Sequence, residues 1–181
     1  EPYEDHIIDI GLTPNRSDAM SHLGVARDVC SWLNHHEGTS IQPIITLKNE
    51  IPATGIACPI EVIIDNTADC PRYTGILIND VQVGASPKWM QQRLKAIGQR
   101  SINNIVDITN YILHDTGQPL HAFDADQIKG GKVRIKNLPA GTSFIGLDEK
   151  ERKLEAGDLM ICDNDSNPMC MGGVLAAKAV V

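Results

Sequence analysis

Residues 100–124 read RSINNIVDITNYILHDTGQPLHAFD and carry clear helix and turn signals. Its isoleucines recur at three- and four-residue spacing, which predicts a helix at about 104–116 that ends before Gly117. Gly117 and Pro119 then favour a turn, because glycine permits backbone conformations outside the helical region and proline fixes its own φ angle. The stretch therefore predicts a helix followed by a polar loop that carries His121.

Hydrophobic periodicity outside this stretch predicts further elements. Ser86 and Pro87 open a helix over about 86–97, because a hydroxyl cap followed by proline is a typical helix start. An earlier helix is predicted from Ser17, its expected cap, to about Leu33. Runs rich in β-branched residues predict strands at 6–12, 60–65, 73–83, 132–136, 144–147 and 159–162.

The order of these elements indicates the fold class and the domains. The helices are grouped and the strands come in runs, which favours an α+β fold over a doubly wound parallel sheet. Residues 39–58 carry prolines and glycine without a clear period, so we expect a connector there. We expect a small strand-helix segment at 1–38. Residues 59–181 should form a module with a mixed or antiparallel sheet and two central helices.

Composition is that of an ordinary globular protein, with 42% hydrophobic and 22% charged residues. The net charge of −7 argues against a general nucleic-acid binder, which gains affinity from cations that neutralise phosphates. No apolar run approaches the ~20 residues that cross a bilayer, so no membrane partner is expected.

The five cysteines form no C-x-x-C pair, so we expect no metal site and a cytoplasmic setting. The chain opens on Glu1 without methionine or a signal peptide, which suggests a piece of a longer protein.

Two groups of titratable or charged residues are candidates for chemistry. Histidine exchanges a proton near neutral pH, so His121 is a candidate acid or base, and the alternative is a loop histidine bonded to backbone. Arg100 could hold a phosphate or a ligand carbonyl. With Lys88, Arg93 and Lys95 it forms the densest basic cluster of an acidic chain, and the alternative is an ordinary solvated helix face.

Polar residues within the apolar pattern of 104–116 are a second signal. Asp and Asn are poor helix-interior residues because their side chains compete for backbone groups, so Asp107 and Asn110 point either to function or to capping and exposure. The adjacent Gly172 and Gly173 permit close approach of backbone to a ligand, or mark a simple turn. Neither glycine-rich nucleotide motifs, H-E-x-x-H nor G-x-S-x-G occur.

Read in order, several blocks of the sequence resemble one family. The chain is similar to the β subunits of bacterial phenylalanyl-tRNA synthetase, from the end of their B1 domain at 1–38 through most of their B3/B4 module at 59–181. The blocks that carry the resemblance are TPNRSD at 13–18, GVARD at 24–28, CPRY at 70–73, the residues 100–110 and 117–124, LMICD at 159–163 and MGG at 171–173.

The resemblance implies a function for the intact protein. Such an enzyme is an αβ heterotetramer that attaches phenylalanine to tRNA(Phe) with ATP and Mg²⁺, and its α subunit carries the synthetic site. The B3/B4 module edits, by hydrolysing tyrosine wrongly joined to the acceptor end of tRNA(Phe). No cofactor and no metal are expected in this chain itself.

The resemblance also implies roles for residues that match the family pattern. His121 and Asn110 would hold the substrate ester and the attacking water, and Arg100 would contact the tRNA end. Thr109 would line the pocket, and the backbone at 172–173 would lie near the aminoacyl group. We expect these groups to converge on one cavity between the two halves of the module.

One departure from the family pattern bears on activity. In the family, a carboxylate that reads the tyrosine hydroxyl follows the two glycines. Here residues 174–181 read VLAAKAVV and contain no acidic residue. We therefore expect editing by this chain alone to be weak or absent, and the alternative is a non-catalytic module that positions tRNA or packs against the α subunit.

Overall fold

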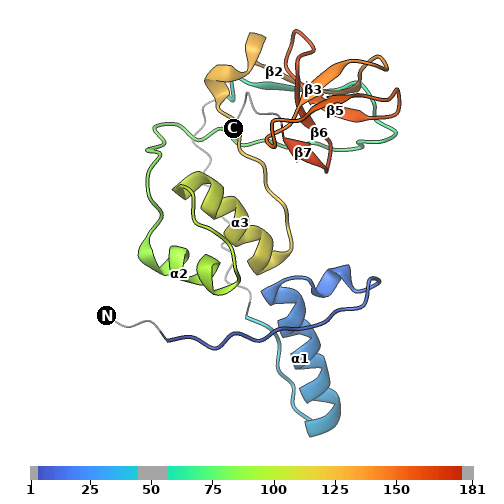
Figure 1. Ribbon diagram of the computed structural model, residues 1–181. Coiled ribbons are helices and arrows are strands. Elements are labelled where there is room, and N and C mark those ends of the chain that lie inside the picture. The colour runs from blue at the N-terminus through green and yellow to red at the C-terminus, as the bar shows by residue number, and fades with distance from the viewer. Residues whose placement is uncertain (1–3, 45–56, 177–181) are drawn as a thin grey trace. The chain divides into compact units, whose positions relative to one another are not determined.

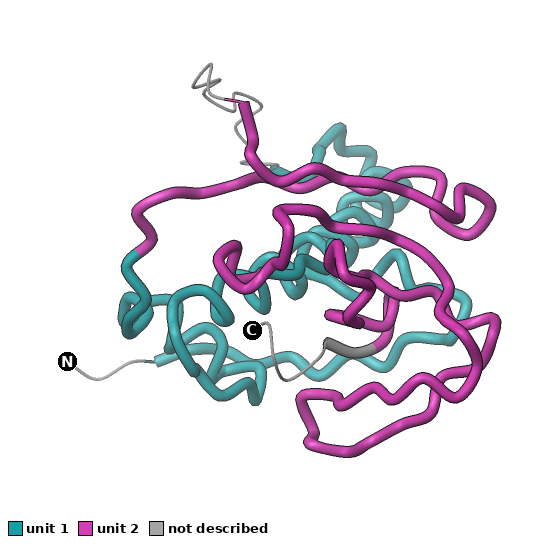
Figure 2. The backbone as a smooth tube through the Cα atoms, turned by 90° about the horizontal axis from the view of Figure 1, so that it is seen from above, with its two compact units in different colours: residues 1–52, 82–122 teal, residues 53–81, 123–181 magenta. Residues whose placement is uncertain are grey.

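The computed structural model describes residues 4–44 and 57–176. Contacts within the chain divide it into two compact units, each built from two stretches of sequence (Figure 2). Unit 1 comprises residues 1–52 and 82–122, and unit 2 comprises residues 53–81 and 123–181. The division of the sequence at 1–38, 39–58 and 59–181 stays a prediction, and much of the expected connector, residues 45–56, lies outside the described residues.

Unit 1 is helical in its described part, and α3 contacts both other α-helices (Figure 1). The Asn103 side chain caps α3, accepting hydrogen bonds from the amides of Ile105 and Val106 at 3.0 and 2.9 Å. Gly117 ends α3 with φ of 81°, a left-handed conformation that glycine adopts without a steric penalty. The elements are η1 (Ser17–Ala19), α1 (His22–Glu37), α2 (Lys88–Ala96) and α3 (Asn104–Thr116). The predictions of α2 and α3 are confirmed.

The start of the first helix differs from the prediction. Ser17 lies in η1, and the cap of α1 is Ser21, whose Oγ accepts a hydrogen bond from the Gly24 amide at 3.0 Å. A Cβ on Gly24 would lie 2.3 Å from the backbone oxygen of Asp18, so only glycine fits. The single helix predicted from the periodicity is therefore a short 3-10 turn, η1, followed by the separate helix α1.

Unit 2 is built on a mixed five-stranded sheet in the order β1-β2-β5-β6-β7. The pair β1–β2 is parallel and the other neighbours are antiparallel, while β3 and β4 form a separate antiparallel pair. The predicted α+β class with a mixed sheet is confirmed. The strands are β1 (Glu61–Ile64), β2 (Lys132–Asn137), β3 (Ser143–Ile145), β4 (Glu151–Lys153), β5 (Leu159–Cys162), β6 (Pro168–Met171) and β7 (Leu175–Ala176). The short turns η2 (Ala125–Gln127) and η3 (Lys129–Gly131) precede β2.

The apolar core of unit 2 draws its buried residues from β2, β3, β5, β6 and adjoining loops. The alternation predicted at 132–136 is confirmed, since Val133 and Ile135 are buried while their neighbours are half-exposed. Phe144 and Met160 are fully buried. The core members are Ile128, Val133, Ile135, Leu138, Phe144, Leu154, Met160, Ile161, Cys162, Met169 and Cys170.

Two predicted strands are wrong. Residues 6–12 and 73–83 form no strand in the described part of the chain. Ile8 is 78% exposed, and Ile76 and Ile78 are each 71% exposed. β-branched composition favours an extended backbone, but a strand also requires a neighbouring strand to receive its hydrogen bonds, and these segments have none among the described residues.

Three short strands were not predicted. β4 is charged at each of its residues, β6 begins with Pro168, and β7 contains two residues. Each pairs antiparallel with a strand nearby in sequence, so the turns between them, rather than their own composition, place them in a sheet.

Candidate functional site

The six residues with expected roles fall in both units. Arg100, Thr109, Asn110 and His121 belong to unit 1, while the glycines at 172–173 belong to unit 2. The expected convergence of all six on one cavity stays a prediction.

Arg100 follows the end of α2. The amides of Gly98 and Gln99 donate to the carbonyls of Lys95 and Leu94, and Gly98 has φ of 78°, so the helix closes immediately before the arginine. The Arg100 side chain is exposed and has no hydrogen-bond or ion-pair partner among the described residues. Its guanidinium is therefore available to an external anion.

Thr109 and Asn110 are consecutive residues of α3. Side chains one position apart on a helix diverge by roughly 100°, so the two groups face different directions. The Thr109 hydroxyl donates to the Val106 carbonyl at 2.8 Å. The Asn110 amide is half-buried and has no partner among the described residues, which leaves its donor and acceptor for a ligand.

A buried carboxylate organises the region between α2 and α3. Asp107 is 0% exposed and accepts hydrogen bonds from the Ser86 hydroxyl, from the Ser101 hydroxyl at 2.5 Å and from the Ile102 amide at 2.8 Å. These contacts tie the segment before α2 and the segment before α3 to one side chain. They hold the backbone immediately after Arg100.

The hydrogen bonds around Asp107 determine its charge state. Burial alone would raise the pKa of this carboxyl, but the three hydrogen bonds together lower the pKa below its ordinary value of 3.8. Asp107 is therefore ionised at neutral pH, and its charge is compensated by hydrogen bonds rather than by a cation. In the sequence, Asp107 stands out only as an unusual polar residue within a predicted helix. Its full burial depends on contacts with residues 21 and 6 positions away in the chain.

Ser86 therefore has another role than the predicted one. The cap position of α2 is Pro87, without a side-chain hydrogen bond to the helix, and the Ser86 hydroxyl donates to Asp107 instead. Asn104 adds a second tie. Its amide group bonds the Gln82 carbonyl at 2.8 Å and the Gly84 amide at 3.0 Å.

His121 lies in the loop after α3, as predicted. The residue is exposed, yet partial removal from water lowers the pKa of His121 below its ordinary value of 6.5. The neutral imidazole is thus the dominant form at pH 7. In that form one ring nitrogen accepts a proton.

The two glycines lie at the end of β6. The Gly172 amide donates to the Leu159 carbonyl at 2.8 Å, and a Cβ on Gly172 would lie 3.1 Å from that oxygen. Gly173 has φ of 71° and opens the turn toward β7. Both positions favour glycine because of their own backbone surroundings, so a simple turn is enough to account for the pair.

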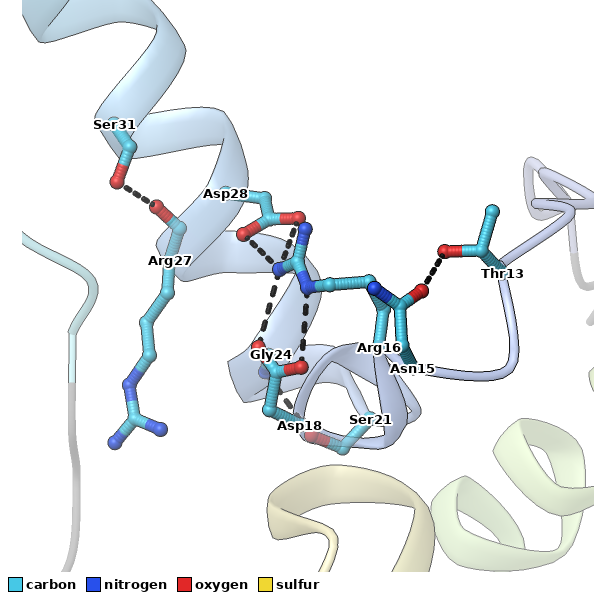
Figure 3. A network of polar contacts seen from close by, with 9 residues as sticks. All are labelled: Thr13, Asn15, Arg16, Asp18, Ser21, Gly24, Arg27, Asp28 and Ser31. Carbon is cyan, nitrogen blue, oxygen red and sulfur yellow. Dashed lines mark hydrogen bonds and ion pairs between the residues drawn. The ribbon is translucent and has the colours of Figure 1, made fainter.

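A second polar network lies at the start of α1 (Figure 3). The Arg16 guanidinium donates to Asp18 at 3.1 Å and to both carboxylate oxygens of Asp28 at 2.7 and 2.8 Å. The hydrogen bond from Arg16 lowers the pKa of Asp18. The network joins the blocks at 13–18 and 24–28, so their side chains hold η1 against α1.

A shallow polar hollow of about 530 Å³ lies in unit 2. None of the six residues with expected roles lines it. Its lining residues are Asp65, Asn66, Thr67, Ala68, Lys136 and Asn137. Within this lining, the Asn66 side chain donates a hydrogen bond to the Asn137 side chain at 2.6 Å. Asp65 and Lys136 bond residues outside the lining, Arg134 and Ser166.

A metal centre and a membrane span are two further features that the described residues lack. Across 4–44 and 57–176, no group of three or more His, Cys, Asp or Glu side chains is placed to hold a metal ion. Within those same ranges, no helix has the length and apolarity to span a membrane.

The fold and these residues define an α+β module in which four of the six candidate residues lie on or beside α2 and α3 of unit 1. Comparison with known sequences identifies the family: the B3/4 domain matches residues 69–180, and the chain belongs to that family.

Several related proteins share one name. The chain is 51% identical over 94% of its length to a "Phenylalanine--tRNA ligase beta subunit" of Porphyromonas gingivalis, and 48% identical over 94% to the protein of that name from Bacteroides thetaiotaomicron. A Carboxydothermus hydrogenoformans protein of the same name is 41% identical over 97% of the chain. The chain spans 20%, 20% and 21% of the lengths of these three relatives. The resemblance to this protein family is thereby confirmed.

Proposed function

We propose that the chain is the editing region of a phenylalanine–tRNA ligase β subunit, where it hydrolyses tyrosine from wrongly charged tRNA(Phe). The observation that carries the proposal is the B3/4 domain match at 69–180, together with relatives of that name. In this proposal the partners are the α subunit and the acceptor end of tRNA(Phe), and the setting is the cytoplasm. ATP and Mg²⁺ serve the synthetic site on the α subunit rather than this chain.

The proposed chemistry asks little of the protein. An aminoacyl ester is already activated, so holding one water against its carbonyl carbon supplies much of the acceleration. A neutral His121 can accept a proton from that water, and the lowered pKa of His121 keeps the ring neutral at pH 7. Arg100 and Asn110 have the free donors needed for a phosphate and for the ester or water.

Specificity is the weaker part of this proposal for the chain alone. A site that hydrogen-bonds the tyrosine hydroxyl would reject phenylalanine, because its buried partner would then lack a bond. No acidic residue occurs in 174–181, where the family pattern places that partner. This observation favours the second candidate, a non-catalytic module that positions tRNA.

The test is deacylation of tyrosyl-tRNA(Phe) by the assembled ligase. We expect His121→Ala to slow deacylation by about 100-fold, the lower range for loss of a positioned acid–base group. Arg100→Ala should also slow deacylation, because a contact to the tRNA end would be lost. His22→Ala and Arg27→Ala, exposed positions on α1, are the matched controls and should leave the rate unchanged.

Two outcomes separate the candidates. Unchanged deacylation in both site variants would exclude the hydrolytic role and leave the positioning module. The 181-residue chain alone is expected to deacylate slowly or not at all, and rapid deacylation by it would contradict the expected lack of a tyrosine-reading group.

A further inference from the structure

Asp107 closes the chain around α2 at both ends of that helix. Its carboxylate accepts a hydrogen bond from the Ser86 hydroxyl, just ahead of α2, and further hydrogen bonds from Ser101 and Ile102, which follow α2. Residues 86–102, called the α2 loop, thus begin and end on one side chain of α3. Because that side chain is 0% exposed, water does not compete for these hydrogen bonds.

Arg100 lies near the end of the α2 loop and is held from both sides. Before it, the Gln99 amide donates to the Leu94 carbonyl at 2.9 Å, which closes α2. After it, Asp107 provides the hydrogen bonds that the next two residues form among the described residues. The backbone of Arg100 is therefore fixed by the end of α2 on one side and by a single carboxylate on the other.

The body of α2 is held against α3 by contacts that do not involve Asp107. Met90 and Leu94 are 7% and 1% exposed, and the rings of Trp89 and Tyr111 meet edge-on with centroids 5.4 Å apart. Loss of the Asp107 hydrogen bonds should therefore release the ends of the α2 loop while the helix itself stays packed. The released part includes the backbone that carries Arg100.

The Arg100 guanidinium depends on this backbone for its position. The side chain is exposed and has no hydrogen-bond or ion-pair partner among the described residues, so no neighbouring group directs it. Such a side chain presents its charge from wherever its Cα is held. A misplacement of about 1 Å in a positioned group can slow a reaction about 100-fold.

We propose that Asp107 is the positioning residue for Arg100: by fixing the residues that follow Arg100, the buried carboxylate sets where the guanidinium meets an anionic group of the substrate. The proposal deepens the proposed function and rests on it for the identity of that substrate. Asp107 is too deeply buried to touch a substrate, so it acts through the backbone at 101–102.

The first experiment needs no substrate. Backbone amide NMR relaxation of the 181-residue chain compares the unchanged protein with Asp107→Ala, which removes all three hydrogen bonds. We expect the order parameters of residues 100–102 to fall from about 0.85, the value of a rigid backbone, toward about 0.6. Ser101→Ala removes only the hydrogen bond nearest Arg100, should cause a smaller fall, and carries the test if Asp107→Ala does not fold.

The matched control removes hydrogen bonds from the same helix. Asn104→Ala deletes the side-chain bonds to Gln82 and Gly84, which lie ahead of α2, and should leave the order parameters of residues 100–102 unchanged. An equal fall in this control would overturn the proposal, because loosening of α3 in general would then explain the effect. Unchanged order parameters at 100–102 in the folded Asp107 or Ser101 variant would also overturn it.

The second experiment is a double-mutant cycle on deacylation of tyrosyl-tRNA(Phe) by the assembled ligase. Asp107→Ala should lower kcat/KM roughly tenfold when Arg100 is present and less than about twofold in the Arg100→Ala background, since the group that it positions is then already gone. Ser101→Ala takes its place in the cycle if Asp107→Ala does not fold. Simple structural damage would slow both backgrounds equally, and that result would overturn the proposal.

The two failures are distinguishable. Absence of deacylation in the unchanged ligase would contradict the proposed function, while the relaxation measurement would still decide whether Asp107 fixes the backbone of Arg100. Deacylation by the unchanged ligase with equal slowing in both backgrounds would remove only the positioning role of Asp107.

Discussion

At the scale of single residues, the structure assigns physical roles to Gly24, Asp107 and His121. Gly24 permits η1 to touch α1, Asp107 joins three segments through hydrogen bonds, and His121 is held in its neutral form. The roles of Asp107 and His121 depend on the immediate surroundings of their side chains, and the role of Gly24 depends on its lack of a side chain. Each is tested by a single substitution.

Replacing Gly24 with alanine should destabilise the protein. Helix propensity alone predicts a gain of about 1 kcal/mol from this change. The new Cβ would lie 2.3 Å from the Asp18 oxygen and 2.6 Å from the Ala19 Cα, so overpacking should instead cost about 1–3 kcal/mol. Urea unfolding measures the sign, with Gly11→Ala as the control, because nothing lies within 4 Å of a Cβ there. A more stable Gly24→Ala variant would show that η1 does not pack against α1 as described.

Asp107→Asn should cost about 1–3 kcal/mol, because the amide group that replaces one carboxylate oxygen cannot accept a hydrogen bond. The lowered pKa of Asp107 means that its ionised form stabilises the folded state fully above pH 3.8, and this contribution is lost as pH falls through the lower folded-state value. The stability difference between the unchanged chain and Asp107→Asn should therefore shrink below pH 3.8. Unfolding free energies over a pH series measure it, and a difference that is constant down to the acid limit would contradict the ionised state.

Deacylation by the assembled ligase should depend on the protonation of His121. Because partial burial lowers the pKa of His121 below 6.5, the neutral form persists at pH 6.5 and the rate should fall only at lower pH. A pH–rate profile in single turnover measures the midpoint, with His121→Ala as the reference that lacks this titration. A midpoint at or above 6.5 would contradict the desolvated ring.

At the scale of elements, α3 is the part whose local signals all agree. Asn103 caps its start, Gly117 ends it in a left-handed conformation, and its intervening residues have helical periodicity. Because α3 carries Thr109, Asn110 and the Asp107 anchor, its ends position the whole candidate site in unit 1.

Removal of the α3 cap should fray the helix start. Asn103→Ala deletes the acceptor for the Ile105 and Val106 amides and should cost about 1 kcal/mol. Asn103→Asp keeps an acceptor and adds a negative charge at a helix N-terminus, so stability should be retained. Hydrogen exchange of the first turn of α3, with urea unfolding, measures both. Equal protection in both variants would show that the cap contributes nothing.

At the scale of the whole molecule, the cysteines report on burial in both units. Cys162 and Cys170 lie in the core of unit 2, and burial raises the pKa of each thiol to about 11. Cys58 is exposed, while Cys30 and Cys70 are half-buried, and no disulfide occurs among the described residues.

Thiol titration with a chromogenic disulfide should therefore proceed in two stages. Up to three thiols should react in the native chain, because reaction requires an accessible thiol that can form the thiolate. Cys58 should react first, since it is the exposed one of the three. The thiols of Cys162 and Cys170 should react only after denaturant is added, since both burial and the raised pKa suppress their thiolates. Five fast-reacting thiols without denaturant would contradict the described core, and single Cys162→Ala and Cys170→Ala variants assign the late signals.

Much of this protein followed from its sequence alone. The family resemblance, the α+β class, the limits of α3 and the alternation of β2 were all predicted, because helix hydrogen bonds and caps lie within a few residues and long sequence blocks are specific. The three-dimensional structure was needed to show that 73–83 pairs with no described strand, that β6 lies inside the sheet and that Asp107 is buried. Those outcomes depend on which segments pair and pack with one another, and neither strand composition nor an isolated polar residue specifies the partner.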